Sequence, residues 1–529
     1  MKKRVFSLLL ILALLMSAVP AGAWAAEAPA EVYCGSLYSP LIGVELAEEP
    51  PEEEPESWYL QGRLVAASGA DAEYVSPETA AVQLRDAMMR RENTVRLYVS
   101  YSGTESYEEL ANAVFNRATD MSIAEGATDG DYLRWVFSDG NYKVWVGEHT
   151  YIYEFHLRYY TTYQQEQEAL SAMERIIAQL DLDGLTDYGK AMAIYRYVAE
   201  HVTYDHAGAA AILEQLELHD QKKDIEQHYF RPHTAYAAVM DGTAVCQGYA
   251  TMLYALYRMA GLPVRIIVGS NHAWNIVQLG GIWYNLDVTT DSNRTNKTWC
   301  FLRGSTNFEG PIAGYIHQRD AEYLTPEFLA QYPVSASDYV SSTRYWDVAE
   351  TNGHVENIER ISQLGIMNGI DKNRPIFGPH NNMERAMLVT VLYRIEGEPQ
   401  SSGPSFRDVP SGTYYTEAVT WAAANGVVQG DGDGTFRPTD SLTRQELVTI
   451  LYRYAAEVRQ FDVSGQADLS AYVDREQLGD WAVEPVRWSV GTGIVKGTTA
   501  TELSPEDTAT REQLATILMR YLTYYGLAA

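Results

Sequence analysis

The sequence contains a cysteine, a histidine and an aspartate, Cys246, His272 and Asp287, whose order and surroundings suit nucleophilic catalysis. In such chemistry a thiolate attacks a carbonyl carbon, an imidazole takes the thiol proton, and a carboxylate orients the imidazole. Each residue alone has a plainer interpretation, as an inert buried cysteine, a hydrogen-bonded core histidine or a carboxylate that caps a turn. The hypothesis therefore depends on the elements that would bring the three side chains together.

A helix is expected to begin at Cys246. Its apolar positions are Ala250, Leu253, Tyr254, Tyr257 and Ala260. Gly261 and Pro263 follow as stop signals. The first N–H groups of a helix have no partner within it, and their partial positive charge favours a thiolate over a thiol. We therefore expect Cys246 to be the nucleophile.

Residues 272–287 predict two antiparallel strands joined by a two-residue glycine turn. If Leu279 pairs with Ile282 across this turn, strand alternation places His272 and Asp287 on one face as diagonal neighbours. Diagonal neighbours lie about 7–8 Å apart at the backbone, which is close enough for a carboxylate to hydrogen-bond an imidazole. We expect Asp287 to fix the tautomer of His272 and to stabilise its charged form.

The surroundings of this site are less well specified by the sequence. Residues 185–205 predict a helix with Asp187 as its N-cap, and residues 207–232 are a polar insertion, which we expect to cover the cleft. The backbone N–H of Cys246 is one expected donor to an oxyanion, and Gln247 and Tyr236 are candidates for the second.

Composition excludes several classes of function. The 529 residues carry a net charge of −30, so nucleic acid and anionic membranes would be repelled. Three scattered cysteines fit neither a disulfide framework nor a zinc site, and whether Cys34 pairs with Cys300 stays open. The stretch that begins at residue 431 has Phe436 at the sixth position and Leu442 at the twelfth, where a calcium loop needs a glycine and a glutamate. We expect no metal and no cofactor.

The N-terminal region predicts export. Residues 1–25 have the charged, apolar and small-residue regions of a secretory signal, with an apolar run too short to span a membrane. Residues 26–57 are read as an acidic, proline-rich linker. Residues 58–170 mix helical and alternating patterns, which predicts a small α/β region of unknown role.

The C-terminal region repeats itself. The motifs GIMNG, GVVQG and GIVKG occupy residues 365–369, 426–430 and 493–497. Each precedes an expected helix, and these helices open near Arg385, Arg444 and Arg511. Three copies of one helical unit are therefore predicted.

Three sequence blocks resemble the transglutaminase-like domain of bacterial cysteine acyl-transfer proteins. They are VCQGYATMLYALYRMAGLPVRIIVG, HAWNIV and WYNLDVT. The resemblance implies a papain-like α+β core over residues 171–335, with catalysis by Cys246, His272 and Asp287. Many relatives carry a tryptophan where this chain has Thr290, a departure that bears on substrate shape more than on chemistry.

The repeats resemble surface-layer homology modules through FRDV, DGTFRP and TRQE in the second copy. The resemblance implies an all-α bundle of three modules, at residues 344–398, 404–459 and 468–529. Such modules hold proteins on anionic wall polysaccharides, so attachment to the cell wall or surface layer is expected. Arg385, Arg444 and Arg511 could grip an acidic glycan together with helix N–H groups, or could instead bind a neighbouring module.

These observations predict an exported, wall-anchored cysteine acyl-transfer enzyme that acts on amide bonds of proteins or wall peptides. Water is always present as an acceptor, so hydrolysis is favoured over crosslinking to an amine. A catalytically inert display module and a lattice component of a surface layer are the alternatives that are not enzymes.

Overall fold

The computed structural model describes residues 31–38, 73–147, 149–218, 225–269, 271–309, 311–312 and 315–528. The predicted signal sequence, residues 1–25, lies outside the described residues, as does most of the predicted linker. Residues 31–38 differ from the linker prediction, because they form strand β1 (Glu31–Tyr38). The stretch EVYCGSLY contains a valine and two tyrosines, residue types that favour strands.

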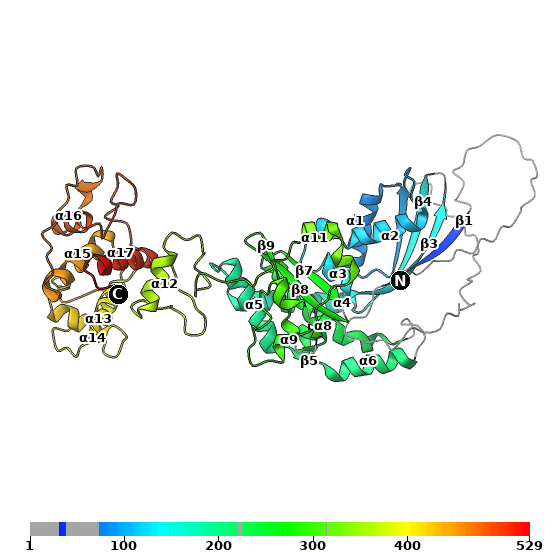
Figure 1. Cartoon of the computed structure of the whole chain (residues 1–529), viewed down its shortest axis with the longest axis horizontal. Helices are drawn as coiled ribbons and strands as arrows, with labels where there is room; N and C mark the ends of the chain where they lie inside the picture. Colours follow the sequence, from blue (N-terminus) through cyan, green and yellow to red (C-terminus); the bar gives the residue numbers. More distant parts are fainter. Residues whose placement is uncertain are drawn as a thin grey trace, which may run out of the picture. The chain divides into compact units, whose positions relative to one another are not determined.

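The described residues form two compact units: those up to 168 together with those of 207–234, and those of 169–206 together with those from 235 onward. The first contains an antiparallel sheet in the order β1-β3-β4-β2 (Figure 1). Its other strands are β2 (Thr94–Ser100), β3 (Phe137–Val146) and β4 (Thr150–Tyr159). Its first helices are α1 (Pro77–Met89), α2 (Tyr107–Ala118), η1 (Met121–Ile123) and α3 (Asp131–Val136). The described residues of this unit therefore combine helices with one antiparallel sheet.

The insertion that the sequence analysis assigned to the second domain groups with the first unit instead. It contains α6 (His206–Leu218) and η3 (Gln227–His233). Three of its apolar side chains, Ile212, Ile225 and Phe230, form a buried cluster with Tyr160. These few apolar residues are spread through a polar segment, which explains why their burial is hard to foresee.

The second unit begins with a mixed core built on a three-stranded antiparallel sheet, β7-β8-β9. The strands are β7 (Val264–Gly269), β8 (His272–Leu279) and β9 (Ile282–Leu286). The long helices are α4 (Tyr163–Leu180), α5 (Asp187–His201) and α8 (Cys246–Met259). Shorter elements are β5 (Thr203–Tyr204), α7 (Ala235–Met240), β6 (Thr243–Ala244), α9 (Val288–Ser292), α10 (Ser305–Phe308), β10 (Pro311–Ile312), β11 (Tyr315–Ile316), η4 (Ala321–Leu324) and α11 (Pro326–Gln331).

Helix α8 is the centre of this core. It packs against α5, α7 and α9 and against strands β7 and β8. Residues 246–257 are buried on every side, not only along the predicted apolar face, because sheet and helices surround the helix. Helix α5 is capped by Thr186, whose hydroxyl accepts the N–H of Gly189, so the prediction of Asp187 as N-cap was off by one residue.

The C-terminal residues are helical and share one hydrophobic core. The long helices are α12 (Val355–Gln363), α13 (Arg385–Ile395), α14 (Thr416–Ala424), α15 (Arg444–Arg453), α16 (Val483–Gly491) and α17 (Arg511–Tyr524). Two short turns are η5 (Tyr454–Val458) and η6 (Arg475–Gln477). We call residues 344–398, 404–459 and 468–528 repeats 1, 2 and 3. Helices from different repeats pack together as the pairs α13 with α14, α15 with α16, and α17 with α12.

One contact recurs in all three repeats. In each, an aspartate accepts two backbone N–H groups from the loop that precedes the second helix. These acceptors are Asp347 for Phe377 and Gly378, Asp408 for Phe436 and Arg437, and Asp474 for Leu503 and Ser504. Repeat 3 keeps this contact although its sequence departs from the others at its start. Within the described residues, no helix combines the length and the apolar character needed to cross a bilayer.

Candidate active site

The hairpin that carries the predicted histidine and aspartate has the expected register. Leu279 pairs with Ile282, and the ladder continues as far as Asn275 and Leu286. Gly280 and Gly281 adopt φ values of 56° and 84°, a left-handed conformation that glycine adopts without strain. One residue beyond the ladder, the chain reaches Asp287, which is the N-cap of α9. The turn therefore fixes which side chains meet at the far end of the hairpin.

His272 and Asp287 meet there as expected. The Nε2 atom of His272 donates to Oδ2 of Asp287 over 3.0 Å, and both residues are almost fully buried, at 2% and 1% exposed. The side chain of Cys246 lies close enough to the imidazole to help raise its pKa. The structure thus brings together the three residues that the sequence analysis singled out.

Cys246 is the first residue of α8, and the N-cap Val245 provides no side-chain hydrogen bond to the first turn. The N-terminal charge of the helix is therefore not satisfied by a capping side chain, and the sulfur lies at this end. Cys246 is a free thiol with only 1% of the residue exposed. The other described cysteine side chain, Cys300, is also a free buried thiol, and burial raises its pKa.

The charges of the site favour an ion pair. Burial by itself lowers the pKa of His272, but the charge and hydrogen bond of Asp287 and the contact with Cys246 outweigh it and raise the pKa to about 10. Burial opposes ionisation of Asp287, yet His272 and a second histidine, His317, lower its pKa. The site is therefore arranged to hold a protonated imidazole beside an ionised carboxylate.

Two residues that the sequence analysis did not assign to the site also bind Asp287. His317 donates from Nε2 to Oδ2 over 2.8 Å, and Thr290 donates its hydroxyl to Oδ2 and its N–H to Oδ1. Thr290 had been noted only as a departure from relatives. His317 comes from the segment after β11 and has no motif around it, so no spacing rule points to it.

The oxyanion candidates remain predictions. Gln247 is fully buried in the first turn of α8, directly after Cys246. Tyr236 belongs to α7, a helix that packs against α8. Both residues therefore belong to helices next to the site.

The three predicted glycan-binding arginines form a different kind of contact. They are 7–9% exposed, and each donates from Nε to a backbone carbonyl of another repeat. The pairs are Arg385 with Phe436, Arg444 with Leu503, and Arg511 with Phe377. Repeat 1 thus binds repeat 2, repeat 2 binds repeat 3, and repeat 3 binds repeat 1.

The backbone N–H groups of these arginines are also in use. They donate to Asp440, Asp507 and Asn381, each in the repeat that the arginine side chain contacts. A glycan therefore does not find these particular amides free, in contrast to the sequence expectation. The alternative role, binding a neighbouring module, agrees with these contacts.

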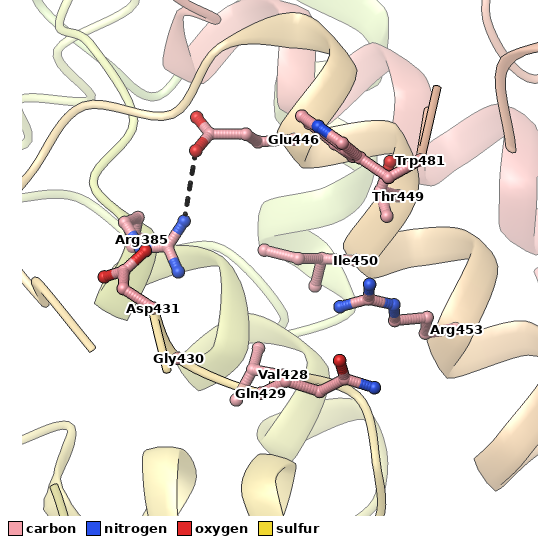
Figure 2. A pocket seen from close by; sticks show the side chains of 10 residues that line it. All are labelled: Arg385, Val428, Gln429, Gly430, Asp431, Glu446, Thr449, Ile450, Arg453 and Trp481. Carbon is pink, nitrogen blue, oxygen red and sulfur yellow. Dashed lines mark hydrogen bonds and ion pairs between the residues drawn. The ribbon is translucent and has the colours of Figure 1, made fainter. Parts of the chain in front are cut away.

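A cavity of about 140 Å³ opens beside Arg385 (Figure 2). Its other lining residues are Val428, Gln429, Gly430, Asp431, Glu446, Thr449, Ile450, Arg453 and Trp481. Figure 2 shows the Arg385 guanidinium joined to Glu446, over 3.2 Å, with the Arg453 guanidinium in the same cavity. All three repeats contribute, because Trp481 belongs to repeat 3. The motif GVVQG forms part of the wall.

Family models match two parts of the chain. The transglutaminase-like superfamily matches residues 174–288, and the S-layer homology domain matches residues 405–448 and 472–515. Repeat 1 lies outside these ranges but has the same aspartate and arginine contacts. A solved structure described as a TGase matches with a TM-score of 0.20 and 16% identity, over 38% of this chain and 56% of that chain.

Relatives among characterised proteins share limited segments. A surface-layer 125 kDa protein of Lysinibacillus sphaericus is 27% identical over 34% of this chain and 15% of its own length. An amylopullulanase of Thermoanaerobacterium thermosulfurigenes is 28% identical over 32% of this chain and 9% of its own length. A cellulosome-anchoring protein of Acetivibrio thermocellus is 24% identical over 28% of this chain and 33% of its own length. The chain therefore spans a third or less of the length of these relatives.

These matches confirm the expected location, because S-layer homology domains and surface-layer relatives mark proteins that are secreted and attached to the cell wall or surface layer. They also agree with the mixed helix and strand core that carries the site. The chain contains a transglutaminase-like domain, followed by S-layer homology domains.

Proposed function

We propose that this protein is a wall-anchored cysteine acyl-transfer enzyme that acts on amide bonds of proteins or wall peptides. The observation that carries the proposal is the buried hydrogen bond between His272 and Asp287, with the Cys246 side chain close enough to the imidazole to raise its pKa. Nucleophile, base and orienting carboxylate are connected in the order that acyl transfer requires. No cofactor takes part in the proposed reaction.

The mechanism follows from the atoms that face one another. His272 uses Nε2 to bind Asp287, which leaves Nδ1 to exchange a proton with the sulfur of Cys246. The thiolate attacks the amide carbonyl, and the C–N bond breaks as the imidazolium gives its proton to the leaving amine. The acyl group is then held as a thioester on Cys246. The N–H of Cys246, with Gln247 or Tyr236 as the candidate second donor, stabilises the oxyanion.

The acceptor decides the product. When water attacks the thioester, His272 takes the water proton, the acid is released and the enzyme is a hydrolase. We propose hydrolysis as the main reaction, since water is always available. The near-complete burial of Cys246 and His272 favours a second candidate, transfer to a lysine-type amine, because a site closed to solvent selects its acceptor.

Product analysis separates these reactions. The mature protein is incubated with wall peptides and with a generic protein, with and without a primary amine, and the products are weighed by mass spectrometry. A gain of one water per cleaved bond supports hydrolysis, and loss of ammonia with gain of the amine supports crosslinking. A Cys246→Ser variant is the control. The absence of either product from both substrates would count against an enzyme.

Thiol labelling tests the site without a known substrate. We expect iodoacetamide to modify Cys246 in a pH-dependent reaction that slows at least about 100-fold in His272→Ala. Cys300 is an internal control, because burial raises its pKa and no histidine activates it. Slow labelling of Cys246 that ignores His272 would instead support an inert display module.

We also propose that the C-terminal repeats form a three-module bundle that binds the wall polysaccharide in the cavity beside Arg385. Two carboxylates also line the cavity, but Glu446 pairs with Arg385 and Asp431 pairs with Arg437. Arg453 has no ion pair among the described residues, so its guanidinium and the half-exposed ring of Trp481 suit an acidic sugar. Arg444 and Arg511 would act less directly, by holding the repeats together.

Sedimentation with purified cell walls tests this anchor. The full chain should sediment with walls, and Trp481→Ala or Arg453→Ala should reduce the bound fraction. Arg475→Ala is a matched control, because its guanidinium binds carbonyls of its own repeat outside the cavity. Sedimentation should also fall when the secondary wall polymer is removed. Equal sedimentation of all variants would contradict the assignment of this cavity.

A further inference from the structure

A second histidine, His317, binds the same carboxylate oxygen as His272. The two Nε2 atoms lie 2.8 Å and 3.0 Å from Oδ2 of Asp287. His317 follows β11, and it therefore reaches the site from outside the β8–β9 hairpin and from outside α8. Its side chain is completely buried. In the reaction proposed above, His317 transfers no proton and contacts no substrate.

Aromatic side chains hold the ring of His317 in place. Its centroid lies 4.0 Å from that of Phe308 and 5.3 Å from that of Trp274, with the tryptophan ring perpendicular. The rings of His317 and His272 are 5.4 Å apart and also nearly perpendicular. A ring packed in this way cannot turn its Nε2 away from Asp287 without disturbing its neighbours.

The remaining nitrogen helps to define the role of this histidine. Among the described residues, Nδ1 of His317 is buried and has no hydrogen-bond partner, which costs free energy. His272, Asp287 and His317 place their donor atoms within 4.8 Å, a set that could also ligate a metal ion. A metal-bound histidine, however, normally donates its other N–H to an acceptor, and His317 has none in the part of the chain described. The hydrogen bond to Asp287 is therefore the polar interaction that accounts for a buried histidine here.

We propose that His317 is a positioning residue that fixes the carboxylate of Asp287 so that His272 stays aligned with Cys246. The inference rests on the acyl-transfer function proposed above. Oδ2 of Asp287 accepts from His272, His317 and Thr290, and Oδ1 accepts the N–H of Thr290. Removal of His317 leaves the carboxylate freer to rotate about its own bond, and His272 then loses its fixed tautomer and direction.

The test compares side chains that reach Asp287 with side chains that do not. His317→Gln can place its amide nitrogen near the position of Nε2, whereas His317→Asn is too short and His317→Leu has no donor. The readout is the rate of iodoacetamide labelling of Cys246 in the full chain, measured from pH 5 to pH 10. We expect a loss of about 10- to 100-fold in His317→Leu and His317→Asn, with a displaced pH profile, and recovery in His317→Gln.

Phe308→Leu is the matched control for packing, since Phe308 contacts the ring of His317 without a hydrogen bond to Asp287. We expect it to lower thermal stability and leave the pH profile in place. If His317→Leu does not fold, the comparison of His317→Gln with His317→Asn shows whether a hydrogen bond to Asp287 is needed.

Two results would overturn the inference, and they differ in meaning. Fast wild-type labelling that is unchanged in His317→Asn, or slowed equally in Phe308→Leu and not restored by His317→Gln, would leave the proposed enzyme standing and reject the role of His317. Wild-type labelling of Cys246 no faster than that of Cys300 would reject the proposed function and this inference together.

Discussion

Thr290 binds the carboxylate of Asp287 at both of its oxygens. The backbone N–H of Thr290 lies 3.0 Å from Oδ1, and its hydroxyl oxygen lies 2.5 Å from Oδ2. Asp287 is also the N-cap of α9, so one carboxylate both starts this helix and orients His272. The residue that first looked like a departure in the substrate region therefore supports the proposed catalytic aspartate directly.

Replacing Thr290 by valine removes the hydroxyl donor and keeps the shape and the N–H. We expect the free energy of unfolding to fall by about 1.5–3 kcal/mol, because a buried hydrogen bond to a charged group is lost. Labelling of Cys246 should slow as well. Urea unfolding and iodoacetamide kinetics measure the two effects, and Thr290→Ser should retain most of both. Equal behaviour of the valine and serine variants would show that the hydroxyl has no role.

The pH dependence of stability reports on His272. Its folded-state pKa of about 10 lies above the unfolded value of about 6.5, so its contribution to stability is fully present below pH 6.5. That contribution is lost progressively as pH rises towards 10. The difference in unfolding free energy between wild type and His272→Gln should therefore shrink over this range. A difference that stays constant from pH 6 to pH 10 would argue against the ion pair.

At neutral pH, ionisation of Asp291 should lower the stability of the protein, whereas the charge on His272 should raise it. Burial raises its pKa to about 6, although it accepts the hydroxyl of Tyr195 and the N–H of Cys300. Its stabilising contribution is present below the unfolded value of about 3.9 and is lost as pH rises through 6. Asp291→Asn keeps an oxygen acceptor and does not titrate.

We therefore expect Asp291→Asn to gain roughly 1–3 kcal/mol relative to wild type between pH 4 and pH 7. Chemical unfolding at several pH values measures this gain. A constant difference between the two proteins across this range would mean that Asp291 does not titrate as expected.

The buried arginines of the repeats should contribute more to the free energy of unfolding than exposed arginines do. Arg444 donates to Leu503 and to Lys496 in repeat 3. Its replacement by methionine leaves buried carbonyls without a partner, and we expect a loss of about 3 kcal/mol in the stability of the C-terminal region. Arg407→Met is the control, since Arg407 is largely exposed. Unfolding followed by circular dichroism compares the two, and equal losses would contradict an inter-repeat role for Arg444.

The sequence predicts the central part of the site because that part is local. Two adjacent glycines specify the hairpin turn, and strand alternation then relates His272 to Asp287 without any knowledge of the rest of the fold. The start and the end of α8 are marked by the chain itself, through Cys246 and Gly261. Strand register and helix ends depend on short segments, and for that reason they can be predicted from the sequence.

The parts that were missed depend on contacts between distant segments. His317 reaches Asp287 across 30 positions, through a stretch with no recognisable periodicity. The assignment of residues 207–232 depended in the same way on a cluster with Tyr160 that no local pattern indicates. The inter-repeat contacts of Arg385, Arg444 and Arg511 also follow from packing, since an arginine that opens a helix looks the same in sequence whether it faces a glycan or a carbonyl.

The cyclic order of the arginine contacts limits how this anchor can be altered. Repeat 3 returns to repeat 1 through Arg511 and Phe377, so all three junctions are satisfied and no unpaired end remains for a fourth copy. Deletion of one copy would open two junctions at once and expose the shared core. Grafting onto another surface protein therefore requires the whole triplet, and shortened or extended versions should misfold or associate with one another.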